Sequence, residues 1–265
     1  GMRGAIVVGT DYPTKTTTPT PTATPEPATF ELERIRAPET SETGREVTYT
    51  VAVTNTGDQP GTFESDVRTK LGNAEWDTTG SLAREIGPGE TVELSTTYAS
   101  RYVATLELEL TAFDERVSTR FTPARLDWGE PFTIPDRYEL TAAGVRFVDS
   151  YEVWTESAEE PTTVRPDEGM KFAWVQFRAE NISITDQSVP ERSEITLLAR
   201  GSEYDYRVSS LYANTYEGGR IRSNDMRQGE ILYQVPDDLA RDEVAVSHSK
   251  SAYVGDVSMT WGETD

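Results

Sequence analysis

The feature that most constrains this chain is a series of short runs in which apolar and polar residues alternate strictly. In residues 47–54, VTYTVAVT, one face carries Val47, Tyr49, Val51 and Val53. A period of two places alternate side chains on opposite faces of a β-strand, so that one face is buried and the other is solvated. Such runs recur as far as residue 261, with Gly, Pro and Asn between them. The pattern predicts an all-β fold.

Residues 29–123 carry about seven of these short strands. The clearest are 30–35, 47–54, 61–69, 91–98, 104–110 and 116–121. Frequent turns between short strands in about ninety residues predict an immunoglobulin-like β-sandwich. Asn55 and Gly57 are interpreted as turn residues rather than ligand-binding residues, because both tolerate positive φ.

The order of motifs in this segment, VTYTVAVTNTGDQPGTF, IGPGETVELSTTY and YVATLELELTAFDE, resembles the cell-adhesion-related domain of bacterial and archaeal surface proteins. The resemblance covers about ninety residues and lies in structural motifs. It implies an immunoglobulin-like fold and says little about activity.

Residues 124–265 predict a second β-sandwich. The expected strands are 145–148, 151–154, 170–181, 195–199, 204–208, 231–236, 244–247 and 257–261. In the run 170–181, MKFAWVQFRAEN, Phe172 and Trp174 lie opposite Ala173 and Val175. Apolar residues on both faces predict that the first half of this strand is covered on both sides.

The landmarks GMKFAWVQFRAEN, ITLLARGSEYDY and QGEILYQVP resemble a secreted immunoglobulin-like family of unknown function, common as the body of bacterial and archaeal lipoproteins. The resemblance implies an extracellular sandwich without known catalytic residues. Members often follow a lipid anchor and a low-complexity linker, and this chain shows no anchor cysteine. A lipid anchor upstream of Gly1 is therefore left open.

Residues 11–28, which we call the stalk, hold seven threonines and five prolines in eighteen residues. Proline lacks a main-chain donor and fixes φ, so the stalk is expected to be an extended, polyproline-like spacer. Its composition also resembles O-glycosylated stalks. The candidate O-glycan acceptors are Thr16, Thr17, Thr18, Thr20, Thr22 and Thr24.

Residues 1–10 contain one short apolar run, Ala5, Ile6, Val7 and Val8. A β-branched run at the end of a spacer can add itself as a strand to the sheet of another molecule. Head-to-tail addition of this kind builds an open filament. Two alternatives stay open at this point: the run is the remnant of an anchor or spacer, or it docks on its own domain.

The net charge of −21 comes from 46 acidic and 25 basic residues, of which 21 are arginine and four are lysine. This balance resembles proteins of salt-loving archaea, because molar salt shortens the Debye length to about 3 Å and screens carboxylate repulsion. An acidic mesophilic protein is the alternative.

So acidic a chain argues against binding nucleic acid or anionic membranes. No apolar run approaches eighteen residues, so no integral membrane segment is expected.

The chain offers little material for catalysis. It has no cysteine, and His248, in the polar context VSHSK, is interpreted as an exposed structural residue. The acidic pairs 159–160, 237–238 and 242–243 lack calcium-loop spacing and are interpreted as solvated surface. We expect no catalytic residues, no bound metal, no cofactor and no enzymatic activity. The single N-x-S/T sequon places a candidate N-glycan on Asn181.

These inferences predict a non-enzymatic, secreted cell-surface protein. It would act in adhesion or assembly, with other copies of itself or other surface proteins as partners, and could form a filament joined by N-terminal donor strands. The alternative is a lipid-tethered extracellular module that binds a small ligand or a cation.

Overall fold

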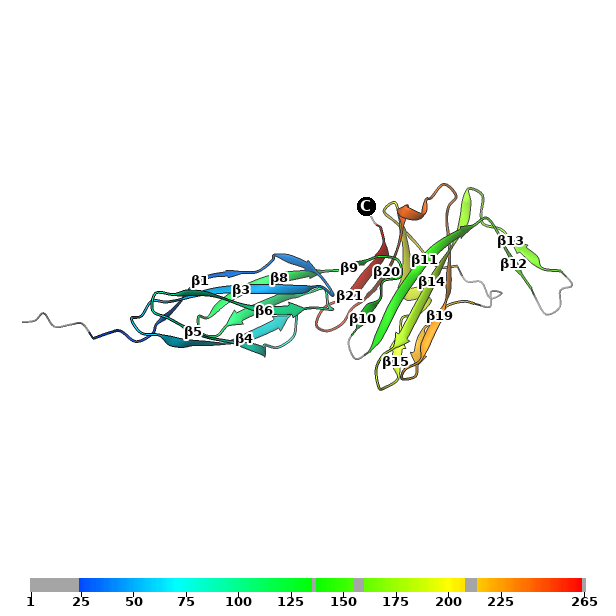
Figure 1. The fold of residues 1–265 in the computed structure, drawn as a ribbon. Coiled ribbons are helices and arrows are strands. Elements are labelled where there is room, and N and C mark those ends of the chain that lie inside the picture. The colour runs from blue at the N-terminus through cyan, green and yellow to red at the C-terminus, as the bar shows by residue number, and fades with distance from the viewer. Residues whose placement is uncertain (1–23, 135–136, 155–159, 208–213, 264–265) are drawn as a thin grey trace, which may run out of the picture.

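The computed structural model describes residues 24–134, 137–154, 160–207 and 214–263. Two β-sandwiches lie end to end (Figure 1), and Pro123 alone separates the last strand of the first from the first strand of the second. The predicted all-β fold with two tandem sandwiches is confirmed. Within the described ranges the helices are single 3-10 turns, η1 (Arg192–Glu194) and η2 (Arg241–Glu243), and none of them could cross a membrane.

The first sandwich, residues 29–123, packs a three-stranded sheet on a five-stranded one. The first sheet has the order β1 (Phe30–Arg36), β3 (Glu46–Asn55) and β6 (Thr91–Ala99). The second has the order β2 (Thr40–Glu42), β8 (Glu115–Thr122), β7 (Thr105–Leu110), β4 (Gly61–Leu71) and β5 (Asp77–Ile86). The inward faces of the alternating runs meet between the sheets, and Tyr49, Phe63 and Phe121 are fully buried there.

Strand β5 was not predicted from the sequence. In DTTGSLAREI only Leu82 and Ile86 are buried, so the run shows no regular alternation of apolar and polar residues. The alternation is missing because β5 pairs with β4 alone and lies at the edge of its sheet. An edge strand needs fewer apolar residues, because much of its surface meets water.

The second sandwich is built in the same way. One sheet has the order β10 (Phe132–Ile134), β11 (Tyr138–Val148), β14 (Met170–Asn181) and β19 (Met226–Pro236). The other has the order β17 (Ser202–Tyr204), β16 (Ile195–Ala199), β20 (Val244–Lys250), β21 (Val257–Gly262) and β9 (Ala124–Leu126). Two small ribbons, β15 (Gln187–Val189) with β18 (Gly219–Ile221) and β12 (Tyr151–Val153) with β13 (Thr162–Val164), complete the domain.

Aromatic rings form the centre of the second core. Phe177 meets Tyr216 and Trp261 edge to face, with ring centroids 5.0 and 5.8 Å apart. Edge-to-face pairs of this kind add about 0.5–1.5 kcal/mol beyond the burial of their area. All three rings are fully buried.

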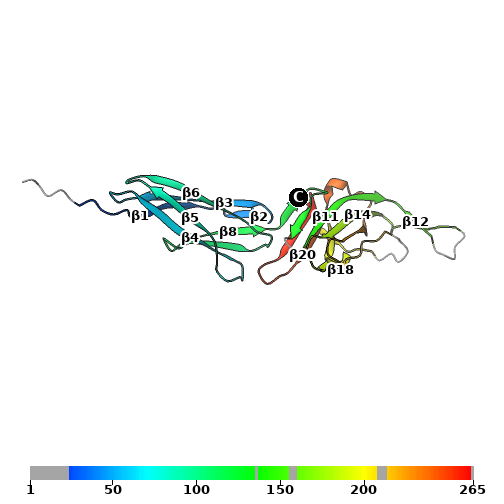
Figure 2. The same ribbon diagram turned by 60° about the horizontal axis from the view of Figure 1, so that its bottom comes forward.

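The first half of β14 is covered on both faces, as its sequence predicted. Phe172 and Trp174, on the face away from the main core, are buried against Leu232 and the ribbon of β12 and β13. Tyr151 of this ribbon contacts both aromatic rings edge to face. Figure 2 shows β12 reaching outward from the end of the domain that lies away from the first sandwich.

The two domains repeat one plan of strand pairing. The order β1-β3-β6 corresponds to β11-β14-β19, and the order β5-β4-β7-β8-β2 corresponds to β17-β16-β20-β21-β9. Even the parallel pairs match, because β2 runs parallel to β8 and β9 runs parallel to β21. This correspondence allows the edges and turns of one domain to be compared with those of the other.

Each domain closes its central strand with a buried asparagine. Asn55 Oδ1 accepts from the Gly57 amide at 3.0 Å, and its Nδ2 donates to the carbonyls of Gln59 and Ile86 at 2.8 and 3.0 Å. We call this the Asn55 corner. These bonds are consistent with a turn role for Asn55 and Gly57, but the predicted reason is wrong, because neither residue has a positive φ.

The Asn181 corner has the same construction. Asn181 Oδ1 accepts from the Ser183 amide at 2.9 Å, and its Nδ2 donates to Thr185 O at 2.8 Å. Further bonds run from Nδ2 to the carbonyls of Ile221 and Arg222, at 3.3 and 2.9 Å. The two asparagines thus tie the end of β3 or β14 to the chain that precedes β6 or β19.

Candidate functional site

The predicted donor strand and most of the predicted O-glycan acceptors lie outside the described residues. This holds for Ala5, Ile6, Val7 and Val8, and for Thr16, Thr17, Thr18, Thr20 and Thr22. Thr24 is described, is exposed and has no regular secondary structure. The roles assigned to these residues stay predictions.

The structure corrects the N-glycan prediction for Asn181. The residue is fully buried, and its Nδ2 donates to three main-chain carbonyls. A glycan on Nδ2 would remove these bonds and would have to enter the domain interior. The sequon matches a closing motif of the fold, and the folded domain does not present Asn181 as an acceptor.

We call residues 1–28 the N-terminal arm. Its root, at residues 25–29, is fixed on the Asn55 corner. The amide of Asp58 donates to Glu26 O at 3.1 Å, and Gln59 Nε2 donates to Pro25 O at 3.2 Å. At Gly57 an added Cβ would lie 2.1 Å from Pro27 O, so only glycine lets the chain pass this closely. The arm therefore starts from a defined point at the outer end of the first sandwich (Figure 1).

A loop of the second sandwich docks on the first and makes a joint between them. This joint loop, residues 251–256, connects β20 and β21. The Val103 amide donates to Asp256 O at 2.7 Å, and Asn73 Nδ2 donates to Tyr253 O at 3.2 Å. Val254 packs against the core of the first sandwich. Gly72 lies so close that an added Cβ would be 1.9 Å from Val254 O.

The joint was not predicted. Its residues appear in the sequence only as turn residues, because main-chain contacts between distant loops leave no periodic pattern. A second contact also joins the two sandwiches: the Arg101 guanidinium of the first lies over the Phe132 ring of the second, at 5.7 Å from its centroid. The two sandwiches are therefore held together by non-covalent contacts as well as by the covalent linker.

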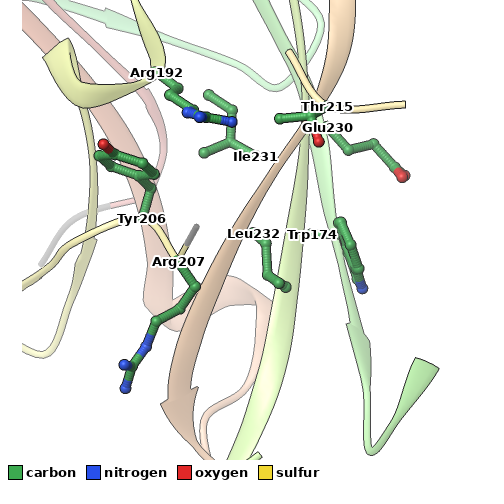
Figure 3. Close-up of a pocket in the computed structure, with 8 residues that line it drawn as sticks. All are labelled: Trp174, Arg192, Tyr206, Arg207, Thr215, Glu230, Ile231 and Leu232. Atoms are coloured by element: carbon green, nitrogen blue, oxygen red, sulfur yellow. The ribbon is translucent and has the colours of Figure 1, made fainter. Parts of the chain in front are cut away.

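A small pocket lies on the β19 side of the second sandwich (Figure 3). Its walls come from Trp174 of β14, three residues of β19, and Arg192, Tyr206, Arg207 and Thr215. In the view of Figure 3, Tyr206 and Arg207 lie on one side of β19 and Trp174 and Glu230 on the other. The pocket offers about 10 Å³ to the centre of a water-sized sphere, which is room for about one water molecule. A small organic ligand does not fit there.

The acidic pair at 242–243 lines a more open cleft beside the hairpin of β16 and β17. Arg200 lines it as well, with Nε 2.7 Å from Glu243 Oε1 and Nη1 3.0 Å from Asp238 Oδ2. This guanidinium holds the pKa of Glu243 at about 2. Among the described residues no three acidic or histidine side chains gather in a way that could hold a metal ion. A cation that binds the Glu243 carboxylate would have to compete with Arg200.

The expectation of an exposed His248 is wrong. The side chain is buried, with Nδ1 2.8 Å from Glu194 O. A carbonyl oxygen can only accept a hydrogen bond, so Nδ1 carries the proton and Nε2 of the neutral ring is unprotonated. Nε2 has no hydrogen-bond partner among the described residues. Burial lowers the pKa of His248 below its ordinary value of 6.5, although nearby Glu194 opposes the shift.

This geometry predicts a loss of stability in mild acid. The folded pKa is lowered, so the unfolded chain takes up the proton first as the pH falls below about 6.5. The free energy of unfolding then falls by at most about 1.4 kcal/mol per pH unit until the folded pKa is reached. Thermal unfolding between about pH 7.5 and pH 5.5 should show this slope in the natural chain and a flatter one in His248→Gln. Equal slopes in the two proteins would contradict the assignment.

Comparisons with known proteins give only distant likenesses to solved structures. No family model and no curated protein matches the chain. An uncharacterised β-sandwich protein from Clostridium difficile 630 is 13% identical over 53% of this chain and 93% of its own, with a TM-score of 0.34. The yjhA protein from Bacillus subtilis is 15% identical over 51% and 99%, with a TM-score of 0.37. A secreted protein from Mycobacterium tuberculosis, MPT63, is 16% identical over 54% and 98%, with a TM-score of 0.35.

These similarities are too low to transfer a function or to assign a family. The resemblances of residues 29–123 and 124–265 to two immunoglobulin-like families stay predictions, while the β-sandwich fold itself is established by the strand pairing.

Proposed function

We propose that the chain is a non-enzymatic protein of the extracellular cell surface that assembles with further copies of itself or with other surface proteins through its N-terminal arm. In this proposal the two sandwiches act as one body, and the composition of the stalk suits a spacer between that body and the apolar run at 5–8. The acid-rich surface suits a medium of high salt, in which repulsion between carboxylates is screened.

The observation that supports this proposal most is the placement of the arm. Its root at Pro25 to Thr29 is bonded to the Asn55 corner, at the end of the body opposite the joint with the second sandwich (Figure 1). An extended spacer that leaves one end of a two-domain body suits end-to-end contacts between molecules. If the arm only tethers the protein, the apolar run is the remnant of an anchor, and deleting it leaves the oligomeric state unchanged.

Deletion of Gly1–Gly9 tests the proposal. The full chain should form concentration-dependent oligomers in molar salt, and the deleted chain should be a folded monomer, because the interacting run is gone and no domain residue is touched. Light scattering after gel filtration measures the mass, and electron microscopy shows the particles. Large species that persist after the deletion would overturn the role of the arm.

The alternative, a tethered module for a small ligand or a cation, rests on the cleft beside Arg200. It requires that a bound ligand raise the unfolding temperature of the monomer. A thermal screen with calcium, magnesium and simple sugars in molar salt would separate it from assembly, which predicts no such rise.

A further inference from the structure

Strand β6 is one of three long edge strands of the first sandwich, with β1 and β5. Strand β6 pairs with β3 over nine residue pairs, and no strand lies on its other side within residues 24–134, all of which are described. Its inward residues Val92, Leu94 and Tyr98 pack on the core but are only partly buried. The core of the first sandwich is thus incompletely covered along this edge.

The corresponding edge in the second sandwich is covered. Segments before and after the gap at 208–213 run along β19, which is the equivalent of β6. Arg207 N donates to Leu232 O at 2.7 Å, Glu230 N donates to Asn214 O at 2.8 Å, and Tyr216 N donates to Glu230 O at 3.0 Å. Here the inward residues Ile231 and Tyr233 are fully buried. The second sandwich therefore supplies from its own chain what the first lacks.

The register of the two domains identifies the equivalent positions. Asn55 corresponds to Asn181, so Thr91, which pairs with Thr54, corresponds to Met226, which pairs with Glu180. Counting along the strands, Ser95 corresponds to Glu230, and Thr97 to Leu232. In β19 the main-chain groups of these two positions point to the covered edge. The amide and carbonyl of Ser95 therefore point to the open edge of β6.

Natural edge strands usually carry devices that prevent pairing, such as proline, lysine, bulges or short length. Strand β6 has none of them: it contains no proline or lysine, its register with β3 is unbroken, and it is nine residues long. Its one charged residue, Glu93, is paired with Arg34 of β1. By contrast, the other two edge strands are both irregular. Strand β1 has a register shift between Leu32 and Arg34. Strand β5 has one where its pairing with β4 passes from Val67 to Arg68.

We propose that the open edge of β6 is the acceptor for the apolar run Ala5–Val8 of a second copy of this chain, which adds as an extra strand beside Glu93 to Thr97. This inference rests on the proposed function and specifies its contact surface. Main-chain bonds from Ser95 and Thr97 would hold the added strand. Alternate side chains of the run would cover Val92, Leu94 and Tyr98, in the way that the segment 214–216 beside β19 covers the core of the second sandwich.

Charge and length favour this occupant. Residues 1–10 contain a single charged side chain, Arg3, whereas the chain as a whole carries −21. An apolar, slightly basic segment suits an acidic body. A second copy is favoured over self-docking because a polyproline-like spacer extends about 3.1 Å per residue and stays stiff over several residues. The sixteen residues from 9 to 24 would hold the run about 50 Å from its own root.

A binding experiment tests the edge itself. The body lacking Gly1–Gly9 is titrated into a fluorescent peptide of residues 1–9 in molar salt, and anisotropy reports binding. Ser95→Pro removes the outward donor and should weaken binding about tenfold or more. Ser95→Ala keeps the main-chain donor and should bind like the unchanged body. Thermal unfolding shows that both variants are folded.

A cross-link gives a second measurement that does not depend on the proline variant. The chain has no cysteine, so the pair Val7→Cys with Ser95→Cys should yield a ladder of disulfide-linked oligomers in the full chain. The pair Val7→Cys with Glu33→Cys, on the opposite edge strand, should not. A ladder with the Ser95 pair supports the inference. A cross-linked monomer would instead show self-docking and overturn it.

The two proposals can fail separately. If deletion of Gly1–Gly9 abolishes oligomers but Ser95→Pro leaves peptide binding unchanged, the arm assembles the protein at another edge and this inference is wrong. If the peptide does not bind the unchanged body, the β6 edge is excluded as its acceptor. If oligomers persist without the arm, the proposed function itself fails.

Discussion

Replacing either corner asparagine with alanine is expected to destabilise its own domain by about 3 kcal/mol. Asn55 and Asn181 are fully buried, and each makes at least three side-chain bonds to main-chain groups of two separate segments. Alanine would leave buried amides and carbonyls without partners, and each unsatisfied group costs about 1–3 kcal/mol. Water entering the cavity would recover part of this loss.

Differential scanning calorimetry in molar salt measures the effect for each domain. Asn55→Ala should lower the transition of the first sandwich, and Asn181→Ala that of the second. Asn214→Ala, at an exposed asparagine outside both corners, is the matched control and should change neither transition. A loss below about 1 kcal/mol at either corner would show that these hydrogen bonds are replaceable by water.

Substituting Gly72 with alanine is expected to open the joint between the two sandwiches while leaving both folded. Gly72 has a φ of +52°, and an added Cβ would lie 1.9 Å from Val254 O. The clash is with main chain, so the joint loop at 251–256 must move away. The bridge between Val103 and Asp256 and the packing of Val254 would be lost with it.

Small-angle X-ray scattering measures this change directly. The chain without Gly1–Gly9, which the proposed function makes a monomer, should scatter as one rigid elongated body. Gly72→Ala in the same shortened chain should show a broader distribution of maximum dimensions. Gly80→Ala is the matched control, because a Cβ at Gly80 meets no atom within 4 Å. If the scattering of Gly72→Ala matched that of the unsubstituted shortened chain, the joint loop would not be what holds the domains in place.

The rigidity of the joint bears on the proposed assembly. A chain that adds its arm to the β6 edge of a neighbour transmits a defined direction only if its own two sandwiches keep a fixed angle. Loss of the joint would leave the arm able to bind while the resulting filament became irregular.

Alternation in the sequence located most of the strands, and the reasons for the failures are physical. The runs at 47–54 and 170–181 were recognised because each has a buried face with unbroken period. Strand β5 was missed because only Leu82 and Ile86 are buried in it. His248 was taken as exposed because its neighbours are polar, yet it lies on the inward side of β20, below the carbonyl of Glu194.

The candidate interaction surface was only half visible in the sequence. The apolar run at 5–8 stands out because its surroundings are polar and rich in proline. Its proposed acceptor does not stand out, since β6 has the same alternating pattern as paired strands such as β3. Whether a strand has a neighbour depends on how distant segments are arranged, and no local pattern records it.

By itself, the sequence determined the all-β class, the two sandwiches and the places where turns occur, because side-chain periodicity and the backbone limits of Pro and Gly act locally. Only the tertiary structure decided that Asn181 closes a corner and offers no glycan acceptor, that a loop at 251–256 joins the sandwiches, and that β6 lacks a partner. These features depend on which main-chain groups meet across the fold, and hydrogen bonds between distant segments leave no pattern in the residues that form them.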